Sequence, residues 1–145
     1  MVMAEATNHY FKHLGVSDGL SQVCIPSIYQ DELGAVWLGT TEGLNRYNGK
    51  DVKVFQPSES NHGLTNNEIN ELCGDKNGRM YIRSGNDLIK LDIYTEQFTC
   101  LRQKGVYGLF CKKDTLWVSC ADGIGRETVL GKDIMAVGKS FFRTE

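Results

Sequence analysis

Short apolar runs, separated by polar turns that contain glycine, recur along this chain. Residues 26–30 form one such run, residues 31–34 a polar turn, and residues 35–39 a second run with aromatic and β-branched side chains. Two apolar runs joined by a tight turn are the pattern of a β-hairpin. Further short runs follow at 43–47 and 51–55. The pattern therefore predicts four short antiparallel strands and no helix of any length.

The same unit returns 44 residues later and then a third time in shortened form. Its turn residues and an aromatic recur at this offset: Asp31, Gly34 and Trp37 become Asp75, Gly78 and Tyr81. The second unit predicts strands at 69–73, 79–83, 87–91 and 96–100, and the third is recognisable at 115–119 and 123–126. An outer aromatic also recurs, as Phe11, Phe55, Phe98 and Phe141. A longer spacing before the last of these indicates an inserted loop near 131–133.

Units of four antiparallel strands with a period in the forties are typical of β-propeller blades. We therefore expect an all-β fold with about three blades, at 19–58, 63–101 and 105–143. A strand near 10–14 precedes them, with the phase of an outer strand that would close a ring. Residues 1–9 are interpreted as a leader or a cloning remnant. Because propellers generally need four to eight blades, we expect an incomplete propeller fragment, the first part of a longer chain.

The composition narrows the classes of function. The chain has 145 residues, with 16 Lys plus Arg against 18 Asp plus Glu and a formal net charge of −2. No basic stripe is present, so nothing supports nucleic-acid binding. Apolar residues make up 41% and stand in runs of four or fewer, which excludes a membrane-spanning helix in this segment. The opening residues lack the charged and apolar regions of a signal peptide.

Five cysteines stand at positions 24, 73, 100, 111 and 120. They include no C-x-x-C motif, and no cysteine and histidine share metal-ligand spacing, so neither a metal site nor a cofactor is expected. Most are expected to be small apolar core residues, because free cysteine is among the most buried residue types. An odd number cannot all pair internally, and the sequence leaves open whether two of them form a disulfide.

Trp37, Tyr81 and Trp117 occupy one position of the repeat. Aromatic faces suit the apolar faces of sugar rings, so these residues could form a binding platform. A residue that recurs at the same phase in every unit more often serves the repeat itself, and packing between blades is the favoured interpretation. Burial of each such side chain would contribute about 1.5–3 kcal/mol.

Three basic residues, Arg46, Lys90 and Arg126, also recur in phase. They could face a sugar or an acidic ligand. The favoured interpretation is structural, namely an ion pair or hydrogen bond with a turn acid of a neighbouring blade, such as Asp31 or Asp75.

No residue pattern indicates catalysis. Residues 75–78 resemble the start of a calcium loop, but a glycine stands where a third oxygen ligand is needed, so a hairpin turn is favoured. Residues 123–125 are too short for a phosphate loop, and no pair of carboxylates stands out. The histidines have no cysteine, serine or aspartate at a telling spacing: His9, His13 and His62. No catalytic residue is assigned, and an enzyme is not expected.

Two segments resemble a known family. Residues 10–22 resemble the start of mature sensor regions in Bacteroides-type hybrid two-component systems. Residues 28–49 look like the two-component-regulator propeller repeat, whose hallmark string reads Q-D-x-x-G-x-x-W-x-G-T-x-x-G-L-x-R-Y. The resemblance covers about residues 10–126 and weakens in the second unit, where Tyr81 replaces the tryptophan and Arg83 the glycine.

In that family the repeats build large periplasmic propellers, followed by a further β-domain, a membrane helix, a histidine kinase and a response-regulator module. The family detects carbohydrates and regulates polysaccharide-utilisation genes. The resemblance implies that this chain is a non-enzymatic part of a periplasmic, ligand-sensing ectodomain, with an oligosaccharide as ligand and no nucleic-acid or membrane contact in this segment. A protein-interaction propeller is the alternative, and a fragment of a propeller lyase or glycosidase is a third.

An open arc of blades has a physical consequence for association. It exposes the faces of its terminal blades, and apolar patches of several hundred Å² tend to find partners, so self-association is expected. Ligand contacts in repeat proteins arise on loops that break the repeat, such as residues 61–62 and 102–104. No ligand-binding residue is assigned from these loops.

Overall fold

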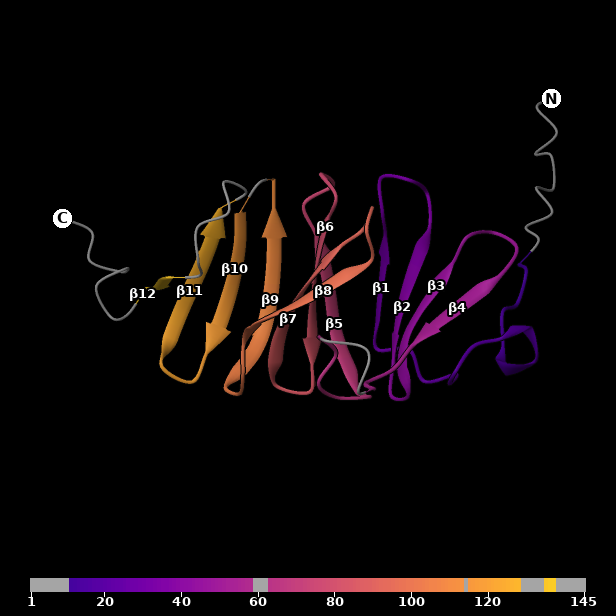
Figure 1. Cartoon of the computed structure of the whole chain (residues 1–145), viewed down its shortest axis with the longest axis horizontal. Coiled ribbons are helices and arrows are strands. Elements are labelled where there is room, and N and C mark those ends of the chain that lie inside the picture. Colours follow the sequence, from indigo (N-terminus) through magenta and orange to yellow (C-terminus); the bar gives the residue numbers. More distant parts are fainter. Residues whose placement is uncertain (1–10, 59–62, 114, 129–134, 138–145) are drawn as a thin grey trace, which may run out of the picture.

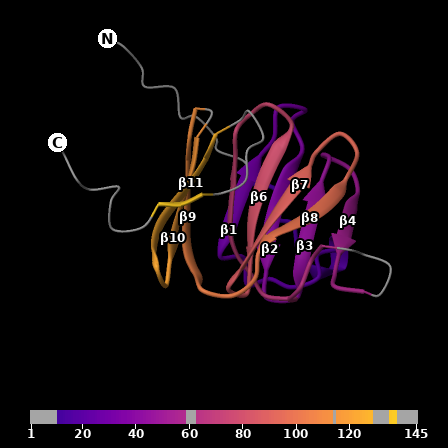
Figure 2. The same cartoon turned by 60° about the vertical axis from the view of Figure 1, so that its left-hand side comes forward.

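The computed structural model describes residues 11–58, 63–113, 115–128 and 135–137. They form three four-stranded antiparallel sheets that stand side by side in chain order (Figure 1). The first and third sheets lie at opposite ends of the row, and Figure 2 shows the third as a layer of its own beside the other two. The expected all-β fold of three blade-like units is confirmed.

Each sheet is a simple meander in which every strand pairs with its chain neighbour. The first sheet contains β1 (Ser27–Gln30), β2 (Val36–Thr40), β3 (Gly43–Tyr47) and β4 (Val52–Phe55). The second contains β5 (Ile69–Gly74), β6 (Arg79–Ser84), β7 (Asp87–Asp92) and β8 (Gln97–Arg102). The third contains β9 (Val106–Lys112), β10 (Thr115–Cys120), β11 (Gly123–Thr128) and β12 (Met135–Val137). A 3-10 turn, η1 (Val16–Asp18), precedes them.

The register repeats from sheet to sheet. In each, the aromatic of the second strand pairs with an equivalent residue of the first strand: Trp37 with Tyr29, Tyr81 with Cys73, and Trp117 with Phe110. Because side chains alternate across a strand, this shared register puts the three aromatics on the corresponding face of every sheet.

The first hairpin turn of the first two sheets is built on an aspartate. Asp31 Oδ1 accepts hydrogen bonds from the backbone N–H groups two and four residues on, each at 2.9 Å. Asp75 Oδ1 accepts the equivalent bonds at 2.7 and 3.2 Å. Gly34 and Gly78 both have a φ of 89°, in the left-handed region that favours glycine. The predicted hairpin turn at 75–78 is confirmed.

The prediction of a strand near 10–14 is wrong for residues 11–14, which are irregular. Phe11 is 84% exposed. A strand needs a neighbour to satisfy its backbone hydrogen bonds, and none of the three sheets includes these residues. The predicted leader at 1–9, the inserted loop near 131–133 and Phe141 lie outside the described residues.

The core lies between sheets. The first interface cluster joins the first and second sheets and contains Trp37, Leu44, Phe55, Leu64, Ile69, Leu72, Met80, Ile82, Ile89, Leu91 and Ile93. The second interface cluster joins the second and third sheets and contains Tyr81, Leu88, Val106, Leu116 and Val118. Each sheet is therefore stabilised mainly by its immediate neighbours, as in other repeat proteins.

Candidate functional site

The recurring aromatic position is a packing position in the first two sheets. Trp37 is fully buried and Tyr81 is 2% exposed, each in the cluster that joins its sheet to the next. The Trp37 ring packs on Phe55 with 5.8 Å between centroids, and Phe55 meets Phe98 of the second sheet edge-on at 5.5 Å. Packing between blades, the favoured interpretation, is confirmed for Trp37 and Tyr81.

Trp37 also makes a hydrogen bond that the second repeat lacks. Its indole Nε1–H donates to Asp31 Oδ2 at 2.7 Å in a buried site. In the second repeat Tyr81 stands in place of the tryptophan, and Asp75 Oδ2 is buried without a hydrogen-bond partner. The loss of one indole N–H therefore leaves an acceptor open at the same turn of the second sheet.

The recurring basic position is structural in the first sheet. The Arg46 guanidinium lies over the Trp37 ring, 5.6 Å from its centroid, and Arg46 Nη1 lies 3.6 Å from Glu96 Oε1. Glu96 belongs to the turn between β7 and β8, so the predicted ion pair with a neighbouring blade is confirmed. The acid differs from the two turn aspartates that were expected, Asp31 and Asp75. The side chain of Arg126 lies outside the described residues.

Four polar residues gather at the rim where the β1–β2 and β5–β6 turns meet, and we call them the rim cluster: Tyr29, Glu32, Asp75 and Lys76. The Tyr29 hydroxyl, both Glu32 carboxylate oxygens and Asp75 Oδ2 are buried without a hydrogen-bond partner. Burial, together with the smaller effect of the charges of Glu32 and Asp75, raises the pKa of Tyr29 from 10.0 to about 12. The Lys76 ammonium lies 4.5 Å from the centre of the Tyr29 ring.

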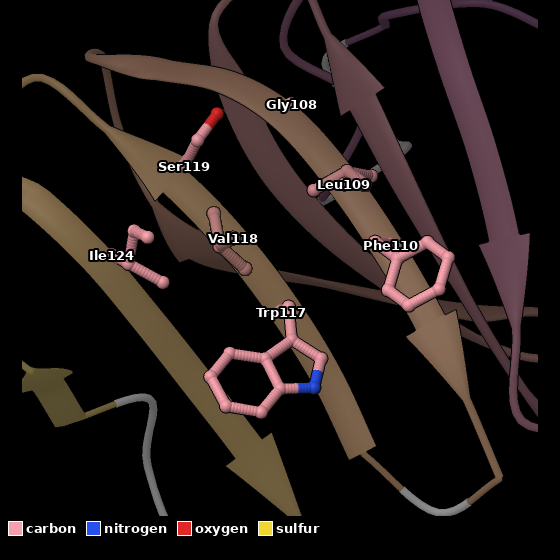
Figure 3. Close-up of a pocket in the computed structure, with 7 residues that line it drawn as sticks. All are labelled: Gly108, Leu109, Phe110, Trp117, Val118, Ser119 and Ile124. Atoms are coloured by element: carbon pink, nitrogen blue, oxygen red, sulfur yellow. The ribbon is translucent and has the colours of Figure 1, made fainter. Parts of the chain in front are cut away.

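The third sheet carries an open apolar hollow on the face that is packed in the first two sheets. It measures about 290 Å³ and is lined by Gly108, Leu109, Phe110, Trp117, Val118, Ser119 and Ile124. Figure 3 shows the rings of Trp117 and Phe110 side by side on neighbouring strands. Phe110 is 59% exposed. Since Trp117 has the phase of Trp37 and Tyr81, this hollow corresponds to an inter-blade face that no described sheet covers.

The loop residues considered from the sequence have structural contacts. Arg102 donates to Asp122 Oδ1 at 2.7 Å and so ties the end of β8 to the β10–β11 turn. Lys104 has a left-handed backbone with a φ of 63°, and its N–H donates to Asp87 Oδ1 at 2.6 Å. Residues 61–62 lie outside the described part of the chain.

No disulfide joins any two of the five cysteines in the structure. Cys24 is exposed, whereas Cys73, Cys100, Cys111 and Cys120 are half-buried. Cys100 packs on the first interface cluster and the other three pack on the second. The expected core role is thus met in part, at the margin of the two clusters.

Neither a metal-binding cluster nor a membrane-spanning helix is present among the described residues. Among the described residues, no three His, Cys, Asp or Glu side chains are grouped so that they could hold a metal ion. Within the same part of the chain, no helix is long and apolar enough to cross a membrane.

Fold and repeat together define a class, namely β-propeller blades. Residues 19–42 match the family model of the two-component regulator propeller. A stretch of 53 residues is 40% identical to histidine kinase P4 of Formosa agariphila, and it covers 37% of this chain and 4% of that relative.

Solved structures agree with this class. The extracellular domain of the hybrid two-component system BT3049 of B. thetaiotaomicron matches with a TM-score of 0.73 and 26% identity, over 89% of this chain and 20% of that domain. The extracellular domain of the hybrid system BT4673 of the same organism matches with a TM-score of 0.70 and 20% identity, over 86% of this chain and 18% of that domain. The second likeness shows the fold alone. This chain spans about a fifth of each of these domains.

Sequence reasoning missed both the rim cluster and the apolar hollow. One signal for the rim cluster was present, because Asp75 is retained while its tryptophan partner is replaced by Tyr81. Nothing in the sequence joins Tyr29 to Gly74 or to Lys76, because those neighbours are created by the stacking of blades.

Proposed function

We propose that this chain is part of the ligand-sensing ectodomain of a periplasmic two-component sensor that detects a carbohydrate and regulates polysaccharide-utilisation genes. The observation that carries the proposal is the propeller repeat at 19–42 together with the likeness to the extracellular domain of BT3049. The chain itself is non-enzymatic in this proposal, with the kinase elsewhere in the full protein. Fold alone does not define function, so the site has to be tested.

The rim cluster is the proposed ligand contact. Its carboxylates are acceptors, and Asp75 Oδ2 and the Glu32 oxygens have no donor in the structure. A sugar is rich in hydroxyl donors, and a hydrogen bond to a charged acceptor contributes about 1.5–3 kcal/mol. Lys76 is exposed and overlies the Tyr29 ring, so a ligand that displaces its side chain would reach these acceptors.

Isothermal titration calorimetry with a panel of oligosaccharides from polysaccharide digests tests the proposal. We expect at least one glycan to bind and to be recovered with unchanged mass. A Glu32→Gln variant should bind it about tenfold more weakly, which corresponds to the loss of one charge-assisted hydrogen bond. Asp51→Asn, an exposed acid in the β3–β4 turn, is the matched control and should bind normally.

Three outcomes would contradict the proposal. Cleavage of the glycan would favour the lyase or glycosidase alternative. Capture of a cellular protein with no glycan bound would favour the interaction scaffold. A folded chain that binds no glycan of the panel would refute the assignment of carbohydrate binding to this segment.

A further inference from the structure

Neighbouring sheets touch through one recurring pair of positions on their first strands. At the first interface, Tyr29 of β1 reaches across to Gly74 of β5, where a Cβ atom would lie 2.1 Å from the Tyr29 hydroxyl oxygen. The glycine is therefore required by the side chain of the preceding sheet. The register identifies the same pair at the second interface. Cys73 has the position of Tyr29, because each pairs with the recurring aromatic of the second strand. Cys111 has the position of Gly74, because each pairs with the residue just before that aromatic.

The equivalent positions of the second interface thus hold two cysteines, Cys73 on β5 and Cys111 on β9. A hydrogen bond two residues earlier on each strand fixes their alignment, since the Leu109 N–H donates to Glu71 Oε2 at 2.8 Å. Glu71 is in turn held by Arg83, whose Nη2 lies 2.9 Å from Glu71 Oε1. Because side chains on one face of a strand recur every two residues, this bond brings the cysteines to the same level.

The surroundings of the two thiols agree with this placement. Both are half-buried and pack on the second interface cluster. Hydrogen bonding to Cys111, together with burial, raises the pKa of the Cys73 thiol. The remaining cysteines lie elsewhere. Cys120 is at the far end of β10, paired with Val106, and Cys100 packs on the other cluster.

We propose that Cys73 and Cys111 form a disulfide that covalently joins the second and third blades. The inference goes beyond the proposed sensor function and relies on it only for the oxidising compartment. The reaction is thiol–disulfide exchange with a small-molecule or protein disulfide. One cysteine thiolate attacks a sulfur of that disulfide and expels a thiolate, giving a mixed disulfide. The second cysteine thiolate then attacks the bound sulfur and expels the other half.

The thiol–disulfide exchange balances in protons and electrons. Two protein thiols lose two protons and two electrons, and the external disulfide is reduced to two thiols. Because thiolates react and the Cys73 pKa is raised, the exchange should accelerate as the pH rises above neutrality. The bond would close a loop of the chain between blades, and such a loop should raise the thermal midpoint by about 10 °C.

Peptide mapping of the folded chain, before and after incubation with oxidised glutathione, tests the proposal. Free thiols are blocked with a maleimide under denaturing conditions, and the chain is cut with trypsin. We expect a linked species made of residues 54–76 and 105–112 that disappears on reduction. Two thiols should be lost from the five, and the thermal midpoint should rise.

Variants distinguish this pair from others. Cys73→Ser and Cys111→Ser should each abolish the linked peptides and the rise in midpoint, whereas Cys24→Ser should leave both unchanged. The wild-type peptide map decides even if a variant fails to fold. Linkage of Cys73 to any other cysteine, or free thiols at both 73 and 111 after prolonged incubation with oxidised glutathione, would overturn the proposal. Because the oxidant is supplied in the assay, the result does not depend on whether the chain binds a carbohydrate.

Discussion

The indole of Trp37 should contribute to stability through its hydrogen bond as well as through its bulk. In a Trp37→Phe variant, Asp31 Oδ2 loses its donor at 2.7 Å while the carboxylate stays 4% exposed. A hydrogen bond to a charged group contributes about 1.5–3 kcal/mol, and the smaller ring adds about 1 kcal/mol of lost packing. We expect a loss of about 3 kcal/mol in the free energy of unfolding. For a chain of this size the thermal midpoint should fall by about 10 °C.

Urea unfolding of a double-mutant cycle separates the two contributions. Asp31→Asn keeps an oxygen for the backbone N–H groups of the turn but can place an amide N–H against the indole N–H. It should therefore be costly beside Trp37 and nearly neutral in the Trp37→Phe background, with a coupling of about 1–3 kcal/mol. Equal costs of Asp31→Asn in both backgrounds would refute the reasoning, because Trp37 would then act through packing alone.

Three further outcomes are expected. Gly74→Ala should destabilise the chain by about 1–3 kcal/mol in urea unfolding because Tyr29 occupies the space of the new methyl group, and Tyr29→Ala should cancel that extra cost. The Tyr29 pKa of about 12 lies above the ordinary value of 10.0, so the contribution of the neutral hydroxyl to the free energy of unfolding is complete below pH 10 and is lost as the pH rises towards 12. A Tyr29→Phe variant whose stability falls equally steeply between pH 10 and 12 would contradict this. Light scattering should show that the chain forms dimers through the hollow beside Trp117. Phe110→Lys should yield monomers, whereas Tyr94→Lys, at an exposed position outside the hollow, should leave the dimer intact; a monomeric wild-type chain would exclude this contact.

The strands were predictable from the sequence because their limits are set by local chemistry. Asp31 and Gly34 define a turn by hydrogen bonds and a backbone conformation that lie within a few residues. The same residues at Asp75 and Gly78 fixed the second unit, and the phase of Trp37 and Tyr81 identified the packed face.

Partners across the interfaces were not predictable from the sequence. Arg46 pairs with Glu96, which lies fifty positions on and belongs to a turn that the repeat does not mark. Gly74 reads as one more turn glycine until Tyr29 is placed against it. The strand near 10–14 failed for a related reason, since its apolar residues fit a strand locally but no sheet accepts their backbone hydrogen bonds. Such contacts depend on how neighbouring blades stack, and the spacing of the sequence repeat does not specify that stacking.

The two interface clusters differ in size, and this difference predicts the order in which the sheets unfold locally. Eleven buried apolar residues join the first and second sheets, but only five described residues join the second and third. Local unfolding follows the distribution of buried contacts, so amide protons of β9 and β10 should exchange with solvent sooner than those of β5 and β6. On this basis we expect the third sheet to open before the first two unfold. Cys73 and Cys111 lie at this smaller interface, where a covalent bond would hold the third sheet to the second.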